Sequence, residues 1–275
     1  MTSKPILPFL ETMITQVCNL SCAGCTNYSD LEHKGYVSWD EGKQQIKSWL
    51  ERIDIPDFGI MGGEPLINPQ WRRWVYGIRE LMPNSQIRFT TNGLLLRKYP
   101  DILDEMIEVG NVVFKITAHT PDSDEFIGKT LATHSFERVE EYGIWRWKGK
   151  NNIRFQVNRP ERFVKTFRGT YETMQPHHSV PELAFGNCCQ QTCPLLYRGR
   201  IYKCSTAGLL REILERFNRP LAEWQDYLHD GIVPGCSDIE LDMFIANFGQ
   251  PATICGQCPD NQTGIIDHLS TVTIK

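Results

Sequence analysis

The sequence predicts an α/β protein in which repeated strand–helix units form a barrel, closed or partial, followed by a smaller domain. From about residue 9 to 185, short β-rich runs alternate with amphipathic stretches at a spacing that fits βα units. No GxGxxG motif accompanies these units, which favours a barrel over a doubly wound dinucleotide-binding sheet. After residue 186 the pattern changes, and seven of the ten cysteines lie there. The predicted domains are therefore residues 1–185 and 186–275.

Six strands are expected in the first domain, because six short runs are rich in β-branched and aromatic residues. They are Phe9–Thr15, Phe58–Met61, Gln86–Thr91, Val112–Ala118, Ile153–Asn158 and Glu182–Phe185. In the second domain, two short apolar runs flank Arg198-Gly199, which predicts a hairpin across Leu195–Cys204.

Four helices are expected between these strands. Ser38 and Glu41 form a capping box before the first helix, and its apolar residues recur at helical spacing. Pro69 suits the first turn of a helix. The other three helices are expected from Asn68 onward, over Asp101–Val109 with a stop at Gly110, and over Ser135–Trp147. Their tryptophans are expected in the core.

The overall composition excludes several classes of protein. Of the 275 residues, 41% are hydrophobic and 23% charged, as in an ordinary globular chain. Lys and Arg number 29 against 33 Asp and Glu, so a nucleic-acid partner is not indicated. No apolar run approaches the roughly 18 residues of a membrane span, and the first residues do not resemble a signal peptide. A cytoplasmic protein without a membrane partner is therefore expected.

The ten cysteines indicate metal ligands, since a long chain without an export signal is an unusual setting for a disulfide scaffold. Cys18, Cys22 and Cys25 fall within eight residues, just after the first expected strand. Four-cysteine zinc sites usually pair two CxxC knuckles from distant segments. Three thiolates on a [4Fe–4S] cluster would instead leave one iron open to a small molecule. The spacing favours a cluster, with zinc as the alternative.

Two motifs in this order resemble the radical SAM superfamily. One is the C-x3-C-x2-C triplet after the first strand, and the other is Gly62-Gly63-Glu64-Pro65 after the second. The resemblance implies a partial (βα)6 TIM-like barrel over about residues 9–185, with S-adenosylmethionine (SAM) as cofactor. It also implies an enzyme that cleaves SAM reductively to a 5′-deoxyadenosyl radical, which abstracts hydrogen from a substrate C–H bond. The cofactor would carry the difficult chemistry.

The same resemblance assigns cofactor-binding residues. Gly62-Gly63-Glu64-Pro65 would contact the amino group of the methionine moiety, and Thr91 and Asn92 would reach its carboxylate or the ribose. The family often has an aromatic residue just before the third cysteine, where this chain has Gly24. Tyr28 is the nearby ring that could replace it against adenine.

The C-terminal cysteines resemble the auxiliary-cluster domain called Twitch, the shortened relative of the SPASM domain. Its features here are the Gly199–Cys204 segment, one earlier cysteine and a later CxxC. The resemblance implies one auxiliary [4Fe–4S] cluster. Its expected ligands are Cys189, Cys204, Cys255 and Cys258, with Cys188 or Cys193 as rivals for the first place. A zinc ribbon is the alternative.

Two further residues are candidate catalytic groups. His119 ends the fourth strand, where it could position substrate or move a proton. Cys236 has no partner in either cluster and is either a small buried hydrophobe or a hydrogen donor at the barrel mouth.

The expected net reaction is an oxidation, a dehydrogenation or cross-link in which the second cluster accepts an electron. An oxidoreductase of this kind needs a one-electron donor such as flavodoxin or ferredoxin, and its substrate, a small molecule or a peptide, is unidentified. About 17 residues precede Cys18, which argues against a built-in leader-peptide domain. The alternatives are an epimerase or peptide-modifying enzyme with a thiol hydrogen donor and, from another class, a non-enzymatic iron–sulfur or zinc protein.

Overall fold

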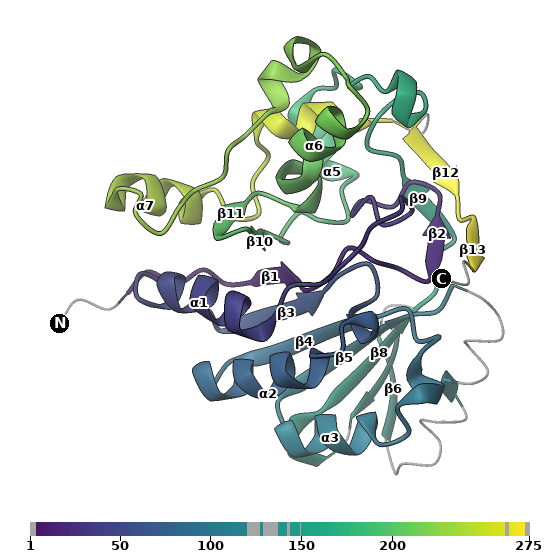
Figure 1. Ribbon diagram of the computed structural model, residues 1–275, viewed down its shortest axis with the longest axis vertical. Coiled ribbons are helices and arrows are strands. Elements are labelled where there is room, and N and C mark those ends of the chain that lie inside the picture. The colour runs from purple at the N-terminus through teal and green to yellow at the C-terminus, as the bar shows by residue number, and fades with distance from the viewer. Residues whose placement is uncertain are drawn as a thin grey trace.

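A nine-stranded sheet organises the computed structural model of the protein (Figure 1). The structure describes residues 4–119, 127–128, 137–141, 144–148, 150–261 and 264–272. In spatial order the strands of the sheet are β11 (Arg200–Tyr202), β10 (Leu195–Tyr197), β1 (Leu10–Met13), β3 (Asp57–Met61), β4 (Gln86–Thr91), β5 (Val112–Thr117), β8 (Arg154–Asn158), β7 (Ile144–Lys148) and β6 (Glu137–Glu141). The strands from β10 to β8 run parallel, and β11, β7 and β6 are antiparallel to their neighbours. The predicted α/β class is confirmed, with an open sheet.

Three helices and a set of short turns cover one face of this sheet. The helices are α1 (Trp39–Leu50), α2 (Trp71–Leu81) and α3 (Ile102–Val109), and the turns are η1 (Pro65–Ile67), η2 (Leu96–Lys98) and η3 (Lys150–Asn152). Ser38 caps α1 as predicted, accepting a hydrogen bond from the Glu41 N–H, and Gly110 ends α3 with a φ of 67°. The predicted core tryptophans Trp49, Trp71 and Trp74 are each at most 2% exposed. Burial of these faces stabilises the helices against the sheet.

Three predicted elements are wrong in type or position. Residues 182–185 belong to helix α5 (Pro181–Gly186), because Pro181 is preorganised for the first turn. The sixth parallel strand is instead β10, which pairs with β1. Helix α2 begins at Trp71 and not at Asn68, whose side chain bonds the backbone of residues 14, 37 and 70. The stretch predicted as a fourth helix contains β6 and β7, in agreement with its valine, isoleucine and tryptophans.

The helices and turns between residues 171 and 257 lie above strands β1 to β8 of the sheet in Figure 1. They are η4 (Tyr171–Thr173), α5, α6 (Ser205–Arg216), η5 (Leu221–Tyr227), α7 (Asp238–Ala246) and η6 (Thr253–Gln257). The predicted hairpin at Leu195–Cys204 is confirmed as β10 and β11, and β10 extends the main sheet. The sheet therefore continues across the predicted boundary at residue 185.

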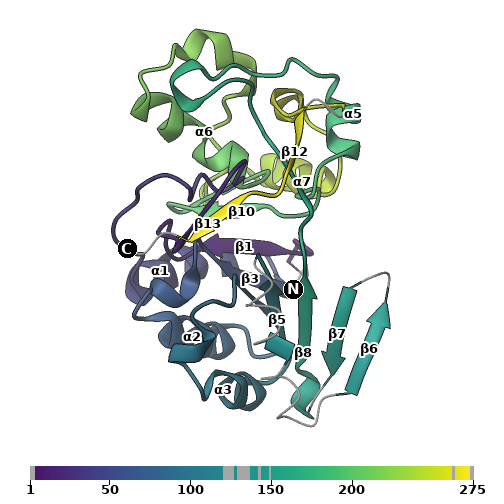
Figure 2. The same cartoon turned by 90° about the vertical axis from the view of Figure 1, so that its right-hand side faces the viewer.

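Two small strand pairs connect the C-terminal segment to the first half of the chain (Figure 2). Strand β12 (Ile265–Asp267) pairs with β9 (Arg162–Val164), and β13 (Ser270–Val272) pairs with β2 (Leu20–Cys22). In the register of the second pair, Ser270 lies opposite Cys22. The C-terminal segment is thus fixed against the cysteine loop. Among the described residues, no helix is both long and apolar enough to cross a bilayer.

Candidate functional site

The three clustered cysteines lie in a buried loop that follows β1. Cys18 and Cys22 are 7% and 9% exposed. Burial raises the pKa of the Cys18 thiol to about 12 and that of the Cys25 thiol to about 11. Without a metal these thiols are therefore protonated at neutral pH, and metal binding must displace their protons.

The spacing of the cysteine sulfurs bears on the kind of metal centre. Among the described residues, the only three His, Cys, Asp or Glu side chains with ligand atoms all within 4.8 Å of one another are Cys22, His119 and His268. A zinc ion with Zn–S bonds of about 2.3 Å holds its sulfurs under about 4 Å apart. The sulfurs of Cys18, Cys22 and Cys25 are too widely spaced for that. The donor set fits a larger centre such as an iron–sulfur cluster.

A cavity of about 360 Å³ opens beside these three sulfurs. The last residues of β3, β4 and β5 line it, so it lies at the carboxyl ends of the parallel strands, where α/β folds place their ligands. Four of the predicted cofactor-binding residues also line it, namely Gly62, Gly63, Thr91 and Asn92. The structure thus gathers three separate sequence motifs around one cavity.

The two glycines let the cysteine loop pass close to the end of β3. A Cβ atom on Gly62 would lie 2.5 Å from the Thr15 carbonyl oxygen, and one on Gly63 would lie 2.5 Å from that of Val17. The Gly63 N–H donates to the Thr15 carbonyl at 2.8 Å. Because the two residues have no side chains, the backbone that leads to Cys18 can pass close to them. Both glycines also line the cavity.

Glu64 and Pro65 do not line the cavity. Glu64 is fully buried, and its carboxylate accepts hydrogen bonds from the Leu66 N–H at 3.0 Å, the Thr91 hydroxyl at 2.7 Å and the Asn92 N–H at 2.7 Å. Burial raises the pKa of Glu64 to about 7, against the opposing effect of these three donors. Glu64 positions the end of β4, and Pro65 begins η1.

Asn92 connects β4 to the cysteine loop. Its Nδ2 donates to the Asn19 Oδ1 at 2.7 Å and lies 3.8 Å from the Cys18 sulfur. Its Oδ1 accepts from the Leu94 N–H. The side chain lines the cavity and at the same time orients the first cysteine.

Tyr28 is not available as a cofactor-stacking ring. It is 1% exposed and packs against Phe167, with ring centroids 6.5 Å apart, and against Tyr171. Phe163 on β9 lines the cavity instead. Gly24 has a φ of 73°, and a Cβ there would lie 2.9 Å from the Ile266 Cδ1 and, at ordinary contact distance, 3.6 Å from the Cβ of Phe163, so the glycine makes room for Ile266 and lies next to Phe163. The pairing of β9 with β12 places Phe163, and no local motif announces it.

His119 reaches the cavity, as expected from its place after β5. Its Nδ1 lies 2.8 Å from Nε2 of His268 and 3.8 Å from the Cys22 sulfur. Burial, followed by the effect of His268, lowers the pKa of His119 to about 4. The two histidines form a hydrogen-bonded pair beside Cys22. His268 was missed in the sequence because the long-range pairings of β12 with β9 and of β13 with β2 bring it there.

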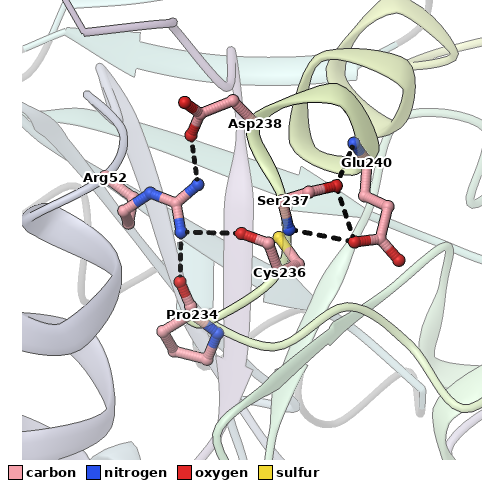
Figure 3. Close-up of polar contacts among 6 residues, drawn as sticks. All are labelled: Arg52, Pro234, Cys236, Ser237, Asp238 and Glu240. Carbon is pink, nitrogen blue, oxygen red and sulfur yellow. Dashed lines mark hydrogen bonds and ion pairs between the residues drawn. The ribbon is translucent and has the colours of Figure 1, made fainter.

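Cys236 lies at the other end of the strands, which contradicts its expected alternative role as a hydrogen donor at the barrel mouth and agrees with the small hydrophobe packed against the core. Its carbonyl oxygen accepts a hydrogen bond at 3.0 Å from Arg52, just after α1 and near the start of β3 (Figure 3). The same guanidinium donates to the Pro234 carbonyl and pairs with Asp238 at 2.8 Å. The side chain of Cys236 packs against the core beneath the sheet. It does not line the cavity and is not placed to donate hydrogen there.

The C-terminal cysteines gather above the loop, and they favour Cys188 over Cys189 as the first member of the set. Burial and then, in decreasing order, the thiols of Cys204, Cys188, Cys255 and Cys189 raise the pKa of Cys258, so Cys188 acts on it more strongly than Cys189 does. Burial raises the pKa of Cys204 to about 12, and Cys188 and Cys255 are the cysteines that act most on it. The charged groups from other elements that most affect the pKa of the Cys189 thiol are Lys115 on β5, which lowers it, and Glu11 on β1, which raises it.

Gln190 links the two groups of cysteines. Its backbone N–H donates to the Cys188 sulfur at 3.2 Å, and its side-chain amide donates to Ser205 at 2.7 Å and Thr26 at 3.0 Å. Thr26 directly follows Cys25, and Ser205 directly follows Cys204. The two cysteine groups are therefore held at a fixed separation.

Comparisons with known proteins agree with this site. Residues 12–142 match the Radical SAM superfamily. A GTP 3′,8-cyclase of Alkaliphilus metalliredigens is 31% identical over 111 residues, which are 38% of this chain and 33% of that protein. A probable GTP 3′,8-cyclase of Methanococcus maripaludis is 36% identical over 93 residues, which are 34% of this chain and 30% of that protein. The chain spans about a third of the length of the curated relatives it matches.

Solved structures show a weaker likeness. The structure of BtrN in complex with AdoMet and 2-DOIA has a TM-score of 0.49 at 15% identity, over 94% of each chain. The structure of Streptococcus suis SuiB has a TM-score of 0.35 at 19% identity, over 45% of this chain and 26% of that one. These scores are too low for an inference about function. The family match covers the cysteine triplet, the glycine motif and the strand ends that border the cavity, so residues 12–142 are similar to a Radical SAM superfamily domain at the residues that form the site.

Proposed function

We propose that this protein is an enzyme that cleaves SAM reductively and uses the resulting radical to abstract hydrogen from a substrate C–H bond. The carrying observation is that the three cysteines, both glycines and the end of β4 border one cavity. When bound, a [4Fe–4S] cluster and SAM supply the one-electron cleavage and the 5′-deoxyadenosyl radical. A non-enzymatic metal protein would need the cysteines but not this cavity.

The residues of the chain hold and shield these groups. Cys18, Cys22 and Cys25 would ligate three irons and leave the fourth open to the methionine end of SAM. Gly62 and Gly63 leave space at that end, because no side chain projects from them into the cavity. With substrate bound in it, such a cavity would restrict the radical to groups that lie beside it and would limit its contact with water and stray donors.

Phe163 takes the aromatic role that the sequence first suggested for Tyr28. Its ring borders the cavity beside Gly24, and His119 lies 6.3 Å away between ring centroids. A flat aromatic face next to a gap is suited to an adenine base, which stacks on such rings.

An auxiliary [4Fe–4S] cluster is part of this proposal. Cys188, Cys204, Cys255 and Cys258 are its proposed ligands, on the electrostatic contacts among their thiols. Cys255 and Cys258 come from η6 and the residue after it, and Cys204 caps α6. Such a cluster could accept an electron from the substrate radical, which would give the oxidised product expected from the sequence.

Iron counting and SAM cleavage test both parts. Anaerobically reconstituted protein is expected to hold about eight irons, four in each cluster. Replacing Cys18, Cys22 and Cys25 by Ala should halve the iron and abolish formation of 5′-deoxyadenosine. Replacing Cys204 and Cys258 by Ala should remove the other half and preserve some cleavage. Cys236→Ala is the matched control and should change neither. Zinc at the C-terminal cysteines, or cleavage without the triplet, would contradict the proposal.

A further inference from the structure

The thiols of Cys188 and Cys189 lie in different surroundings, although the two residues are neighbours in the chain. The backbone turns after Cys188, whose sulfur faces the other C-terminal cysteines and accepts a hydrogen bond from Gln190. Cys189 instead has an exposed side chain that lines the cavity together with Cys18, Cys22 and Cys25. Its thiol therefore faces the space in which the proposed radical forms.

The surroundings of Cys189 are polar groups on the inner face of the sheet. Glu11 on β1 raises the pKa of the Cys189 thiol, and Lys115 on β5 lowers it. The same two groups shift the pKa of the Cys193 thiol in the same directions. Glu11 lies opposite Gly59 on β3, and a Cβ at residue 59 would come within 2.7 Å of the Glu11 Cβ. The glycine thus leaves room for the carboxyl group between the strands. These four side chains, Glu11, Lys115, Cys189 and Cys193, are electrostatically coupled and form what we call the polar cluster, of which Cys189 lines the cavity.

We propose that Cys189 is a hydrogen-atom donor in the radical site and not a ligand of the auxiliary cluster. This proposal rests on the proposed function, because the carbon radical it would quench is generated there. In the transfer the S–H bond of Cys189 breaks and a C–H bond forms at the carbon radical, which leaves a thiyl radical on sulfur. The thiyl radical regains one electron from the one-electron donor that reduces the protein and one proton from solvent. The net change at a substrate quenched in this way is redox-neutral, and this outcome takes the place of the oxidation that electron transfer to the auxiliary cluster would give.

Position and bond strength both support this assignment. An S–H bond is weaker than most C–H bonds, so a thiol beside a carbon radical gives up its hydrogen downhill. Cys236, the donor suggested by the sequence, is at the far end of the strands. Cys189 borders the same cavity as Gly63 and Asn92, the residues proposed to lie next to SAM.

Iron content and thiol labelling test the ligand assignment without any turnover. Cys188→Ser should lose about four of the eight irons, whereas Cys189→Ser should keep all of them. In the reconstituted protein, N-ethylmaleimide should modify Cys189 and spare Cys188, and prior addition of SAM should protect Cys189. Loss of the auxiliary iron in Cys189→Ser, together with full iron in Cys188→Ser, would overturn the assignment.

Deuterium transfer tests the donor role. Thiol hydrogens exchange with solvent, so SAM cleavage in deuterated water without substrate, with titanium(III) citrate as reductant, should place one deuterium in 5′-deoxyadenosine. Cys189→Ser should lower the deuterated fraction about tenfold, because the nearest donor is gone. Cys236→Ser should leave it unchanged. Equal deuterium in wild type and Cys189→Ser would overturn the donor role. Absence of SAM cleavage in the wild type would instead overturn the proposed function. The iron and labelling results would then still decide whether Cys188 or Cys189 is the ligand of the auxiliary cluster.

Discussion

The Glu64 carboxylate accepts a hydrogen bond from the backbone N–H of Asn92 at 2.7 Å, and this contact joins the loop after β3 to the end of β4. Its other oxygen accepts from the Thr91 hydroxyl and the Leu66 N–H. Asn92 in turn touches the Cys18 sulfur. Glu64 therefore holds two borders of the cavity in place without touching it.

Glu64→Gln is expected to destabilise the protein by about 1–3 kcal/mol, since the amide can accept at one oxygen only and its NH2 would face the Asn92 N–H. SAM affinity should fall, while the iron content should stay near that of the wild type. Urea unfolding, SAM binding and iron analysis measure the three effects. The exposed Glu80→Gln is the control. Unchanged stability and affinity would show that Glu64 is not needed to fix this edge.

Gly63→Ala should impair cluster incorporation and not SAM binding alone. The added Cβ would lie 2.5 Å from the Val17 carbonyl oxygen and 2.6 Å from that of Gln16, and backbone atoms cannot rotate away. The segment that leads to Cys18 must therefore shift, at about 1–3 kcal/mol of overpacking. Iron per chain and the cluster absorbance spectrum after reconstitution measure the effect.

Gly235→Ala is the matched control for that variant, because a Cβ at residue 235 would meet no atom within 4 Å. A Gly63→Ala protein with full iron and weaker SAM binding would restore the simpler interpretation, in which the glycine only admits the cofactor.

The sequence predicted those parts of the fold and site that rest on local patterns. The capping residue Ser38, the stop at Gly110 and the cysteine triplet are all visible within a few residues of chain. Pairing between distant segments was not predictable in this way. Strand β13 pairs with β2 across more than two hundred residues, and this pairing together with that of β12 and β9 brings His268 close to Cys22.

One assignment was wrong and another is changed by our proposal, in each case because different structures share one local pattern. A short apolar run at residues 182–185 suits a buried strand or a short helix, and Pro181 decided for the helix. Cys188 and Cys189 are equivalent in spacing, and only the direction of each side chain separates a proposed ligand from a cavity thiol. Such choices depend on tertiary packing, which spacing does not encode.

Arg52→Ala should loosen α7 from the rest of the molecule. The guanidinium donates to the carbonyl oxygens of Pro234 and Cys236 and pairs with Asp238 (Figure 3). Because the two carbonyls lose a charged donor, a loss of about 1–3 kcal/mol is expected. Limited proteolysis should then cut near α7 more quickly, with iron content unchanged.

Asp238→Asn separates the ion pair from the carbonyl contacts. The Asp238 side chain is 93% exposed, so its pairing with Arg52 should contribute little. Proteolysis of this variant should match that of the wild type. If Asp238→Asn loosens α7 as much as Arg52→Ala does, the ion pair and not the carbonyl contacts holds the helix.

Glu11→Gln should change the pH dependence of stability. Burial raises the pKa of Glu11 to about 8 from 4.5, although Lys115 and Arg88 act in the opposite direction. The folded state therefore binds a proton more tightly than the unfolded state does. The stability from this proton is fully present below about pH 4.5 and is lost as the pH rises through about 8. The wild-type free energy of unfolding should thus fall across this range, by at most about 1.4 kcal/mol per pH unit for this group.

The variant isolates this contribution because Gln keeps the shape of the side chain and cannot ionise. Glu64, with a pKa of about 7, also contributes to the wild-type slope, so the interval between about pH 7 and 8 is the most informative one. In anaerobic urea unfolding, Glu11→Gln should flatten the curve in that interval, while Glu80→Gln should retain the wild-type slope. A Glu11→Gln protein with the full wild-type slope would mean that Glu11 is ionised in the folded state at neutral pH. The polar cluster of Glu11, Lys115, Cys189 and Cys193 would then contain an ionised Glu11 carboxylate in place of a neutral carboxyl group.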